Sequence, residues 1–137
     1  MWGRFTRRDG GYSMVELVVV IVIIGVLAAV AIPLYLNHQN KANDAAAQSD
    51  AMNLGTLIRA AYDENTTVVD VDLVDGEYVI DGDPVLAASP GVEFVAWTPG
   101  DIDSWCVQLM HPNGDVSDDP GVRFDAQNGY VENAECS

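Results

Sequence analysis

Apolar residues form one uninterrupted stretch near the start of the chain. From Leu17 to Leu36, 20 residues follow one another without a charge, about the shortest helix that spans a bilayer core of roughly 30 Å. Gly25 and Pro33 are its two weak points, because a proline inside a helix removes a backbone donor and loosens or kinks it. The pattern predicts a transmembrane helical segment over residues 12–36 that is apolar on all sides.

After residue 36 the pattern becomes that of an amphipathic helix. Apolar residues recur at steps of three and four, the spacing of one helical face: Ala47, Ala51, Leu54, Leu57, Ile58, Ala61 and Tyr62. Polar residues supply much of the other face: Asn40, Lys41, Asn43, Asp44, Gln48, Asp50 and Arg59. We therefore predict one long N-terminal helix over residues 12–65. A domain is expected to pack against one side of its second half.

β-Branched and aromatic residues become frequent beyond this helix. The candidate strands are Thr67–Leu73, Glu77–Ile80, Val92–Trp97, Trp105–Met110, Val122–Asp125 and Tyr130–Glu132. Asn128-Gly129 is typical of a tight hairpin, and Asp81-Gly82 and Asn113-Gly114 mark further turns. The predicted fold class is α+β, with residues 66–137 forming a small antiparallel β-sheet head packed on the long helix. Trp97 and Trp105, which flank a tight connection, are expected in its core.

One carboxylate, Glu16, stands at the head of the apolar stretch. An ionisable group in a transmembrane segment costs about 2.5–3.5 kcal/mol at the bilayer centre and less near the headgroups. We therefore expect Glu16 to pair with a positively charged group from outside this segment.

Charges are distributed unevenly around the stretch. Three of the six basic residues precede it and three follow it: Arg4, Arg7 and Arg8, then Lys41, Arg59 and Arg123. The positive-inside rule keeps the N-terminus in the cytoplasm and exports the rest. Beyond Glu16, 19 acidic residues face those three basic ones. This balance favours a soluble exported head and argues against direct nucleic-acid binding.

Both cysteines, Cys106 and Cys136, fall in the predicted exported part. Export to an oxidising compartment favours a disulfide between them, which would contribute on the order of 3–4 kcal/mol in the chain-entropy model. Buried free thiols and a metal pair are the alternatives.

The N-terminal segment resembles that of type IV pilins and type II secretion pseudopilins. The residues that match are a short basic leader ending in Gly11, the run from Tyr12 to Leu17, Gly25, and the segment from Ala28 to Pro33. Two features depart from the family pattern: Asp9-Gly10 stand where a basic residue is common, and Tyr12 replaces phenylalanine or methionine.

The resemblance implies a sequence of processing and assembly steps for the chain. A membrane prepilin peptidase would remove the leader, residues 1–11, by cutting between Gly11 and Tyr12, and would methylate the new N-terminus at Tyr12. Glu16 would become the fifth residue of the mature protein, and Pro33 matches the family's helix-loosening position. The chain would polymerise through residues 12–36 with itself or other pilins, on an assembly platform driven by a cytoplasmic ATPase. It would leave the inner membrane for an extracellular or periplasmic filament.

Two simpler interpretations compete with a filament subunit. A secretory signal cleaved at Ala29-Val30-Ala31 would release a soluble binding domain, although Glu16 interrupts the start of such a signal. A plain single-span anchor explains the length of the apolar stretch but not Gly11, Glu16 and Pro33 together.

The acidic turns suggest a weak calcium hypothesis. Asn113, Asp115, Asp118 and Asp119 cluster hard oxygen ligands without the spacing of an EF-hand, and a solvated acidic loop is the simpler interpretation. No other cofactor is expected. No set of residues combines a nucleophile, a base and an oxyanion donor, so the chain is not expected to be an enzyme.

Overall fold

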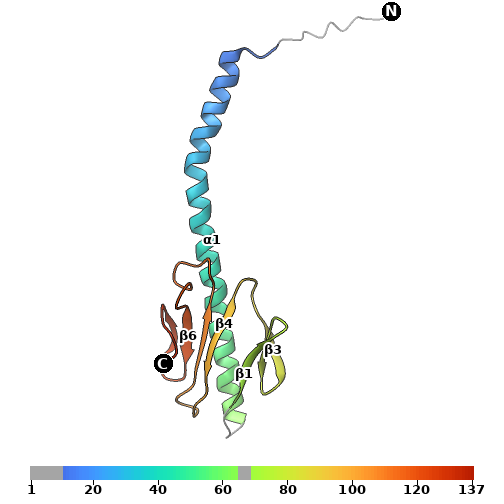
Figure 1. Ribbon diagram of the computed structural model, residues 1–137, viewed down its shortest axis with the longest axis vertical. Coiled ribbons are helices and arrows are strands. Elements are labelled where there is room, and N and C mark those ends of the chain that lie inside the picture. The colour runs from blue at the N-terminus through green and yellow to red at the C-terminus, as the bar shows by residue number, and fades with distance from the viewer. Residues whose placement is uncertain (1–10, 65–68) are drawn as a thin grey trace, which may run out of the picture. The chain divides into compact units, whose positions relative to one another are not determined.

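The computed structural model describes residues 11–64 and 69–137. Their contacts divide the chain into two units, which meet between Leu36 and Asn37. One helix, α1 (Met14–Glu64), contributes to both units (Figure 1). It begins two residues after the predicted start, and residue 65 lies outside the described part. Pro33 lies inside α1, which continues on both sides of it.

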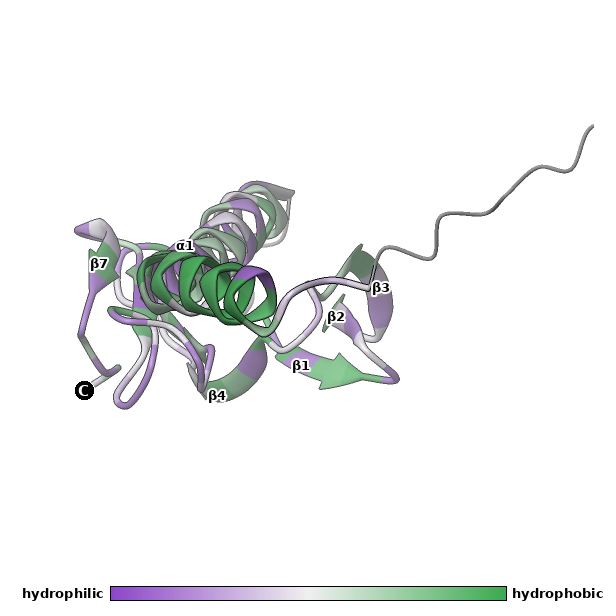
Figure 2. Ribbon diagram, turned by 90° about the horizontal axis from the view of Figure 1, so that it is seen from above, coloured by the Kyte–Doolittle hydropathy of each residue, from purple (hydrophilic) through white to green (hydrophobic). Residues whose placement is uncertain are grey.

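The part of α1 that belongs to the second unit buries the predicted apolar stripe. Ala47, Ala51, Leu54 and Ile58 are fully buried, Tyr62 is nearly so, and Leu57 and Ala61 are half-buried. Figure 2 shows the strands arranged along one side of this helix. The apolar residues whose spacing predicted the helix are thus the residues that pack against the sheets.

In the described residues of the second unit, seven strands form two antiparallel sheets (Figure 1). The first sheet has the order β1-β2-β3, and the second has the order β4-β5-β6-β7. Their bounds are β1 (Val71–Val74), β2 (Glu77–Ile80), β3 (Asp83–Ala87), β4 (Glu93–Thr98), β5 (Cys106–Met110), β6 (Val122–Asp125) and β7 (Gly129–Glu132). The predicted α+β fold is confirmed, with two sheets in place of one.

Two strand predictions need correction. The sequence prediction omits β3, which contains Pro84, a residue that argues against a strand. β3 is an edge strand of its sheet, where a missing backbone donor is tolerated. The first strand begins at Val71, and residues 69 and 70 before it are not in a strand; the predicted start at residue 67 lies outside the described part.

Two of the predicted turns place a residue in the left-handed backbone region. Ile80 pairs with Asp83 across the two-residue turn Asp81-Gly82, where φ is 53° and 91°. Asp125 pairs with Gly129, so the last hairpin has a three-residue connection, and Gly129 follows it with φ 70°. These are the positions where glycine and aspartate are favoured over β-branched residues.

An aromatic cluster forms the core between α1 and the second sheet. Trp105 is 1% exposed and stacks on Tyr62 and Phe124, with ring centroids 6.2 and 5.9 Å apart, while Trp97 lies tilted against it and is half-buried. Gly55 on α1 is buried directly against the Phe124 ring, and a Cβ at that position would overlap the ring. The absence of a side chain at Gly55 is what allows this close approach.

Candidate assembly site

The residues around the expected cleavage position form the start of α1. Gly11, Tyr12 and Ser13 are exposed and not helical, and the helix begins at Met14. The Ser13 backbone N–H donates to Glu16 Oε2 at 3.0 Å, and the Glu16 N–H donates to Ser13 Oγ at 3.2 Å. This reciprocal pair is a capping box, which satisfies backbone donors at the start of a helix.

The capping box gives the Glu16 carboxylate a hydrogen-bond partner, but not a charged one. Its carboxylate accepts a neutral N–H from its own segment, while no cation among residues 11–64 and 69–137 forms an ion pair with it. A hydrogen bond from a neutral donor satisfies one oxygen but leaves the charge uncompensated. The pattern Ser13-x-x-Glu16 was the signal in the sequence that could have revealed the box.

The apolar segment of the first unit exposes its side chains on all sides. From Leu17 to Leu36 the large apolar side chains are 48–67% exposed, and hydrophobic colour surrounds this part of α1 in Figure 2. The segment is long and apolar enough to cross a membrane. A Cβ at Gly25 would meet no atom of the chain, so this position is open to a close neighbour.

The loop with the calcium candidates is held by side chains of α1. Asp44 Oδ1 accepts the backbone N–H groups of Asp115, Val116 and Ser117 at 2.9, 3.1 and 3.0 Å, and the Ser117 hydroxyl at 2.7 Å. Asn40 donates to Asp115 Oδ1 at 2.9 Å. Three successive N–H groups thus surround one carboxylate oxygen supplied by the protein itself.

The other calcium candidates of this loop have different surroundings from Asp115. Asn43 donates to the backbone carbonyl of Asn113 at 2.9 Å, and Asp118 and Asp119 are exposed. Within residues 11–64 and 69–137, no three His, Cys, Asp or Glu side chains gather in a way that could hold a metal ion.

The contacts of Asp44 lower the pKa of its carboxyl group. Burial alone would raise the pKa of Asp44, but the hydrogen bonds from the Ser117 side chain and from three backbone N–H groups outweigh it and lower the pKa below its ordinary value. Sequence reasoning placed Asp44 on a polar helix face and did not link it to a loop about seventy residues away.

Asp50 was also expected on the polar face, and this expectation is wrong. Its side chain is 4% exposed. The carboxylate accepts the Tyr78 hydroxyl at 2.9 Å, and the backbone N–H and hydroxyl of Ser89 at 2.8 and 2.7 Å. Burial, followed by the charge and hydrogen bond of Asp50, raises the pKa of Tyr78. Asp50 therefore ties α1 to β2 and to the segment that leads into β4.

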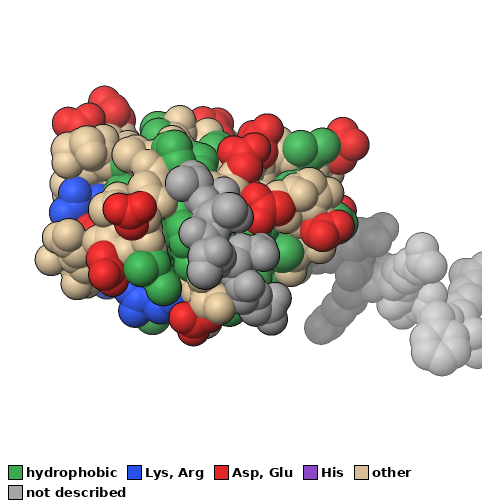
Figure 3. All heavy atoms as spheres, turned by 90° about the horizontal axis from the view of Figure 1, so that it is seen from below, with side chains coloured by type: hydrophobic (Ala, Val, Ile, Leu, Met, Phe, Trp, Pro, Cys, Tyr) green, Lys and Arg blue, Asp and Glu red, His purple; other side chains and the backbone are tan. Residues whose placement is uncertain are grey.

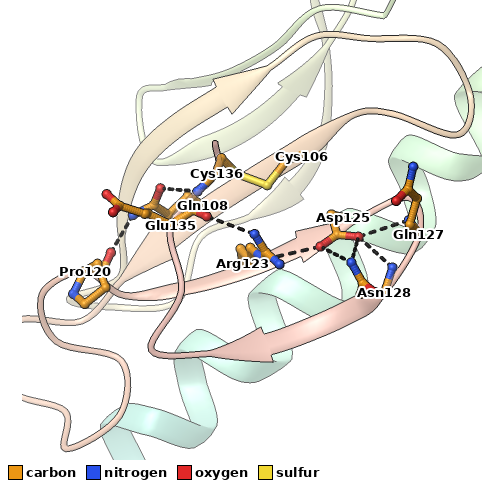
Figure 4. The surroundings of a disulfide bond; sticks show 9 residues. All are labelled: Cys106, Gln108, Pro120, Arg123, Asp125, Gln127, Asn128, Glu135 and Cys136. Atoms are coloured by element: carbon orange, nitrogen blue, oxygen red, sulfur yellow. Dashed lines mark hydrogen bonds and ion pairs between the residues drawn. A yellow bond between two sulfur atoms is a disulfide. The ribbon is translucent and has the colours of Figure 1, made fainter.

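A disulfide joins Cys106 and Cys136, as expected, with the two Cα atoms 5.8 Å apart (Figure 4). Hydrogen bonds hold the C-terminal segment beside it. The Cys136 N–H donates to Gln108 Oε1 at 3.0 Å, and Arg123 donates to the Glu135 carbonyl at 3.0 Å. Arg123 also forms an ion pair with Asp125 at 3.2 Å. The end of the chain is thus fixed to β5 and β6.

The surface of the second unit is acidic. Figure 3 shows Asp and Glu side chains spread over the face seen from below, interleaved with apolar and neutral groups. Opposite charges on this unit are few, since Lys41, Arg59 and Arg123 are the basic residues beyond residue 36. Such a field keeps a head soluble and repels other acidic surfaces.

Comparisons with known proteins match one family and several relatives over part of the chain. The family described as "Prokaryotic N-terminal methylation motif" matches residues 6–32. The type IV major pilin protein PilA of Myxococcus xanthus is 34% identical over 61 residues, which cover 44% of this chain and 28% of that protein. The type IV narrow pilus major component PilA5 of Thermus thermophilus is 38% identical over 55 residues, covering 40% of this chain and 44% of that protein.

A third relative, the fimbrial protein EcpB of Eikenella corrodens, is 56% identical over 35 residues, covering 26% of this chain and 22% of that protein. The matched segments therefore span less than half the length of each of these relatives. No solved structure matches the chain significantly.

The matched segment and the fold define a class of protein: an N-terminal methylation motif opens a long apolar helix, which continues into a small β-rich head. The chain thus carries the prokaryotic N-terminal methylation motif and is similar to type IV major pilins over part of its length.

Proposed function

We propose that the chain is a structural subunit of a type IV pilus-like filament, assembled through the apolar part of α1. The observation that carries this proposal is the exposed apolar surface on all sides of that segment, with a single carboxylate at its start. A helix that is apolar all round needs lipid or other apolar helices around it. The methylation motif and the similarity to a type IV major pilin support helices of neighbouring subunits as the final surroundings.

In this proposal, cleavage of the Gly11–Tyr12 bond by a prepilin peptidase creates the cation that Glu16 lacks. The new α-amino group at Tyr12, once methylated, pairs with Glu16 of a neighbouring subunit. A paired charge in a medium of low dielectric constant is far less unfavourable than an isolated one. Wrong alignments of two helices leave the charge unpaired, so the pair selects one stagger.

Transfer from lipid to a filament gains little from the hydrophobic effect, because lipid tails are as apolar as the helices. Packing and the charge pair must then determine the geometry. Small residues such as Gly25 and Ala29 allow the close approach of helices, and Pro33 provides a point where the helix can adjust.

The remaining parts of the proposal follow from the similarity to type IV pilins and from the charges. The precursor spans the inner membrane with its N-terminus in the cytoplasm, as the positive-inside rule favours. An assembly platform and a cytoplasmic ATPase extract it into an extracellular or periplasmic filament. The chain has a structural and not an enzymatic role.

N-terminal sequencing of the protein recovered from cells tests the processing. The proposal expects a chain that begins at methylated Tyr12, present in membranes and in filaments sheared from the cells. A soluble protein that begins at Ile32 would contradict it in favour of a secreted domain, and an intact Met1 would indicate a plain anchor.

A Glu16→Ala variant tests the assembly step separately. We expect the variant to be cleaved at Gly11 but to yield few filaments, because the amine of each neighbour then lacks its partner. Glu93→Ala in the exposed part of the head is the matched control and is expected to assemble normally. Normal filaments from Glu16→Ala would refute the charge pair.

A further inference from the structure

A groove of about 270 Å³ lies between the last turns of α1 and the hairpin of β2 and β3. Leu57 and Ala61 of α1 line it, together with Ile80, Asp81 and Asp83 of the hairpin. Ile80 is buried and Leu57 and Ala61 are half-buried, whereas the two aspartates are exposed. The groove therefore has an apolar bottom and two carboxylates at its edge.

The two carboxylates of the groove lack a cation. Asp81 Oδ1 accepts the backbone N–H of Asp70 at 2.9 Å, a neutral donor that leaves the charge uncompensated. Among residues 11–64 and 69–137, neither Asp81 nor Asp83 forms an ion pair. A lysine side chain combines an apolar methylene stem with a charged end. The groove thus matches a cationic side chain in both shape of polarity and charge.

Lys41 is the basic residue of the head whose charge is not yet engaged. Arg123 already has an ion pair, and Arg59 donates to a backbone carbonyl. Lys41 is exposed and forms no ion pair within the described residues. The acid three residues further on, Asp44, binds a distant loop through its Oδ1. The side chain of Lys41 is therefore free to meet an acidic surface.

Lys41 cannot reach the groove of its own chain. Both lie on α1, and at 1.5 Å per residue the distance along the helix is about 24 Å from Lys41 to Leu57 and about 30 Å to Ala61. This is far beyond the length of a lysine side chain, so a second copy must supply the cation. Because the cation and the groove lie at different places, the contact is heterologous and can repeat from copy to copy.

We propose that the groove between α1 and the β2–β3 hairpin binds Lys41 of a second copy of this chain. The stem of Lys41 lies on the apolar bottom, and its ammonium group meets Asp81 and Asp83. Parallel helices joined in this way are staggered by about 24–30 Å. Acidic heads repel one another, and this contact offsets the repulsion at one defined place. The inference rests on the proposed function and adds a contact between heads, separate from the pair at Glu16.

Chemical cross-linking reads this contact directly, because Lys41 is the only lysine of the chain. A carbodiimide joins an amine to a carboxylate that touches it and adds no spacer. Wild-type filaments are treated with the carbodiimide, digested with a protease and analysed by mass spectrometry. We expect Lys41 to be linked to Asp81 or Asp83. Filaments in which Lys41 is linked to neither aspartate would overturn the inference.

A charge swap tests the same contact without chemical modification. The readout is the amount of chain in sheared filaments divided by the amount of cleaved chain in the membrane, which removes differences in expression and processing. Lys41→Glu is expected to lower this ratio about fivefold, the effect of losing an ion pair at the upper end of the range for exposed pairs. Adding Asp83→Lys should restore most of the loss. Adding Glu132→Lys is the matched control, because it changes the net charge equally at an exposed position outside the groove, and it should restore little.

Two results of the swap would overturn the inference: normal assembly of Lys41→Glu, or equal rescue by Asp83→Lys and Glu132→Lys. The second result would show that only the net charge of the head matters. Failure of the proposed function looks different, because the wild-type chain would then form no filaments, and both proposals would be wrong.

Discussion

Replacing Asp50 by alanine is predicted to be among the most destabilising single changes in the head. The substitution leaves three donors without their acceptor: the Tyr78 hydroxyl, and the N–H and hydroxyl of Ser89. Tyr78 is fully buried, so water cannot replace the lost bond there. Ser89 is half-buried and can recover part of its hydrogen bonding from solvent.

The magnitude follows from these three contacts. A buried donor left unsatisfied costs about 1–3 kcal/mol. The Tyr78 hydroxyl lies at the upper end of this range, and the two Ser89 groups, which solvent partly satisfies, together cost about 1 kcal/mol or less. We expect Asp50→Ala to lower the free energy of unfolding by about 3–4 kcal/mol. This is a large part of the roughly 5–15 kcal/mol typical of a folded protein.

Urea unfolding of the full chain in detergent micelles measures this loss through the fluorescence of Trp97 and Trp105 in the head. Asp63→Ala, an exposed change on the same helix, is the control and is expected to change the free energy by less than about 0.5 kcal/mol. Tyr78→Phe alone should cost about 1–2 kcal/mol, and the Asp50→Ala/Tyr78→Phe double variant should lose less than the sum of the two, because the residues are in contact.

The reasoning is refuted if Asp50→Ala stays within about 1 kcal/mol of the control. It is also refuted if the two changes add without any coupling, since the Tyr78 hydroxyl would then not depend on Asp50.

Three further changes test other contacts of the head by the same unfolding measurement. Gly55→Ala brings a Cβ into the Phe124 ring and should cost about 1–3 kcal/mol; no loss would show that the ring moves freely. Asp44 has a lowered pKa, so its contribution exists above the ordinary value and disappears as the pH falls through the lowered one. The difference in stability between the wild type and Asp44→Asn should therefore shrink below about pH 4, and a constant difference would contradict this account. Replacing Cys106 and Cys136 by serine should cost about 2–4 kcal/mol, and an unchanged unfolding midpoint would argue against the role of the disulfide.

The sequence predicted the elements in which the pattern of apolar residues directly reflects which side chains are buried. The apolar stripe from Ala47 to Tyr62 repeats at helical spacing because each of its members faces the same sheets. The strands other than β3 were recognised for a related reason, since their residues are β-branched or aromatic and turn residues separate them. The edge strand β3 lacks this signal, because Pro84 interrupts it and most of its side chains are exposed.

The polar contacts of the head could not be read from the sequence. Asp44 and Asp50 look like solvent-facing helix residues, and their partners lie in distant segments that only the folded chain brings close. Which oxygen meets which donor depends on the tertiary structure. The capping box of Ser13 and Glu16 is local, and its spacing is visible in the sequence. The prediction for Glu16 considered only a charged partner outside its own segment and did not include this box.

An electron cryomicroscopy structure of the assembled filament tests the central claim most directly, through the distance between Glu16 of one subunit and the N-terminal nitrogen of its neighbours. The account predicts that the carboxylate lies within about 4 Å, the range of an ion pair, of the methylated amine at Tyr12 of an adjacent subunit. A filament in which Glu16 faces solvent, or in which no neighbouring amine reaches it, would contradict the claim.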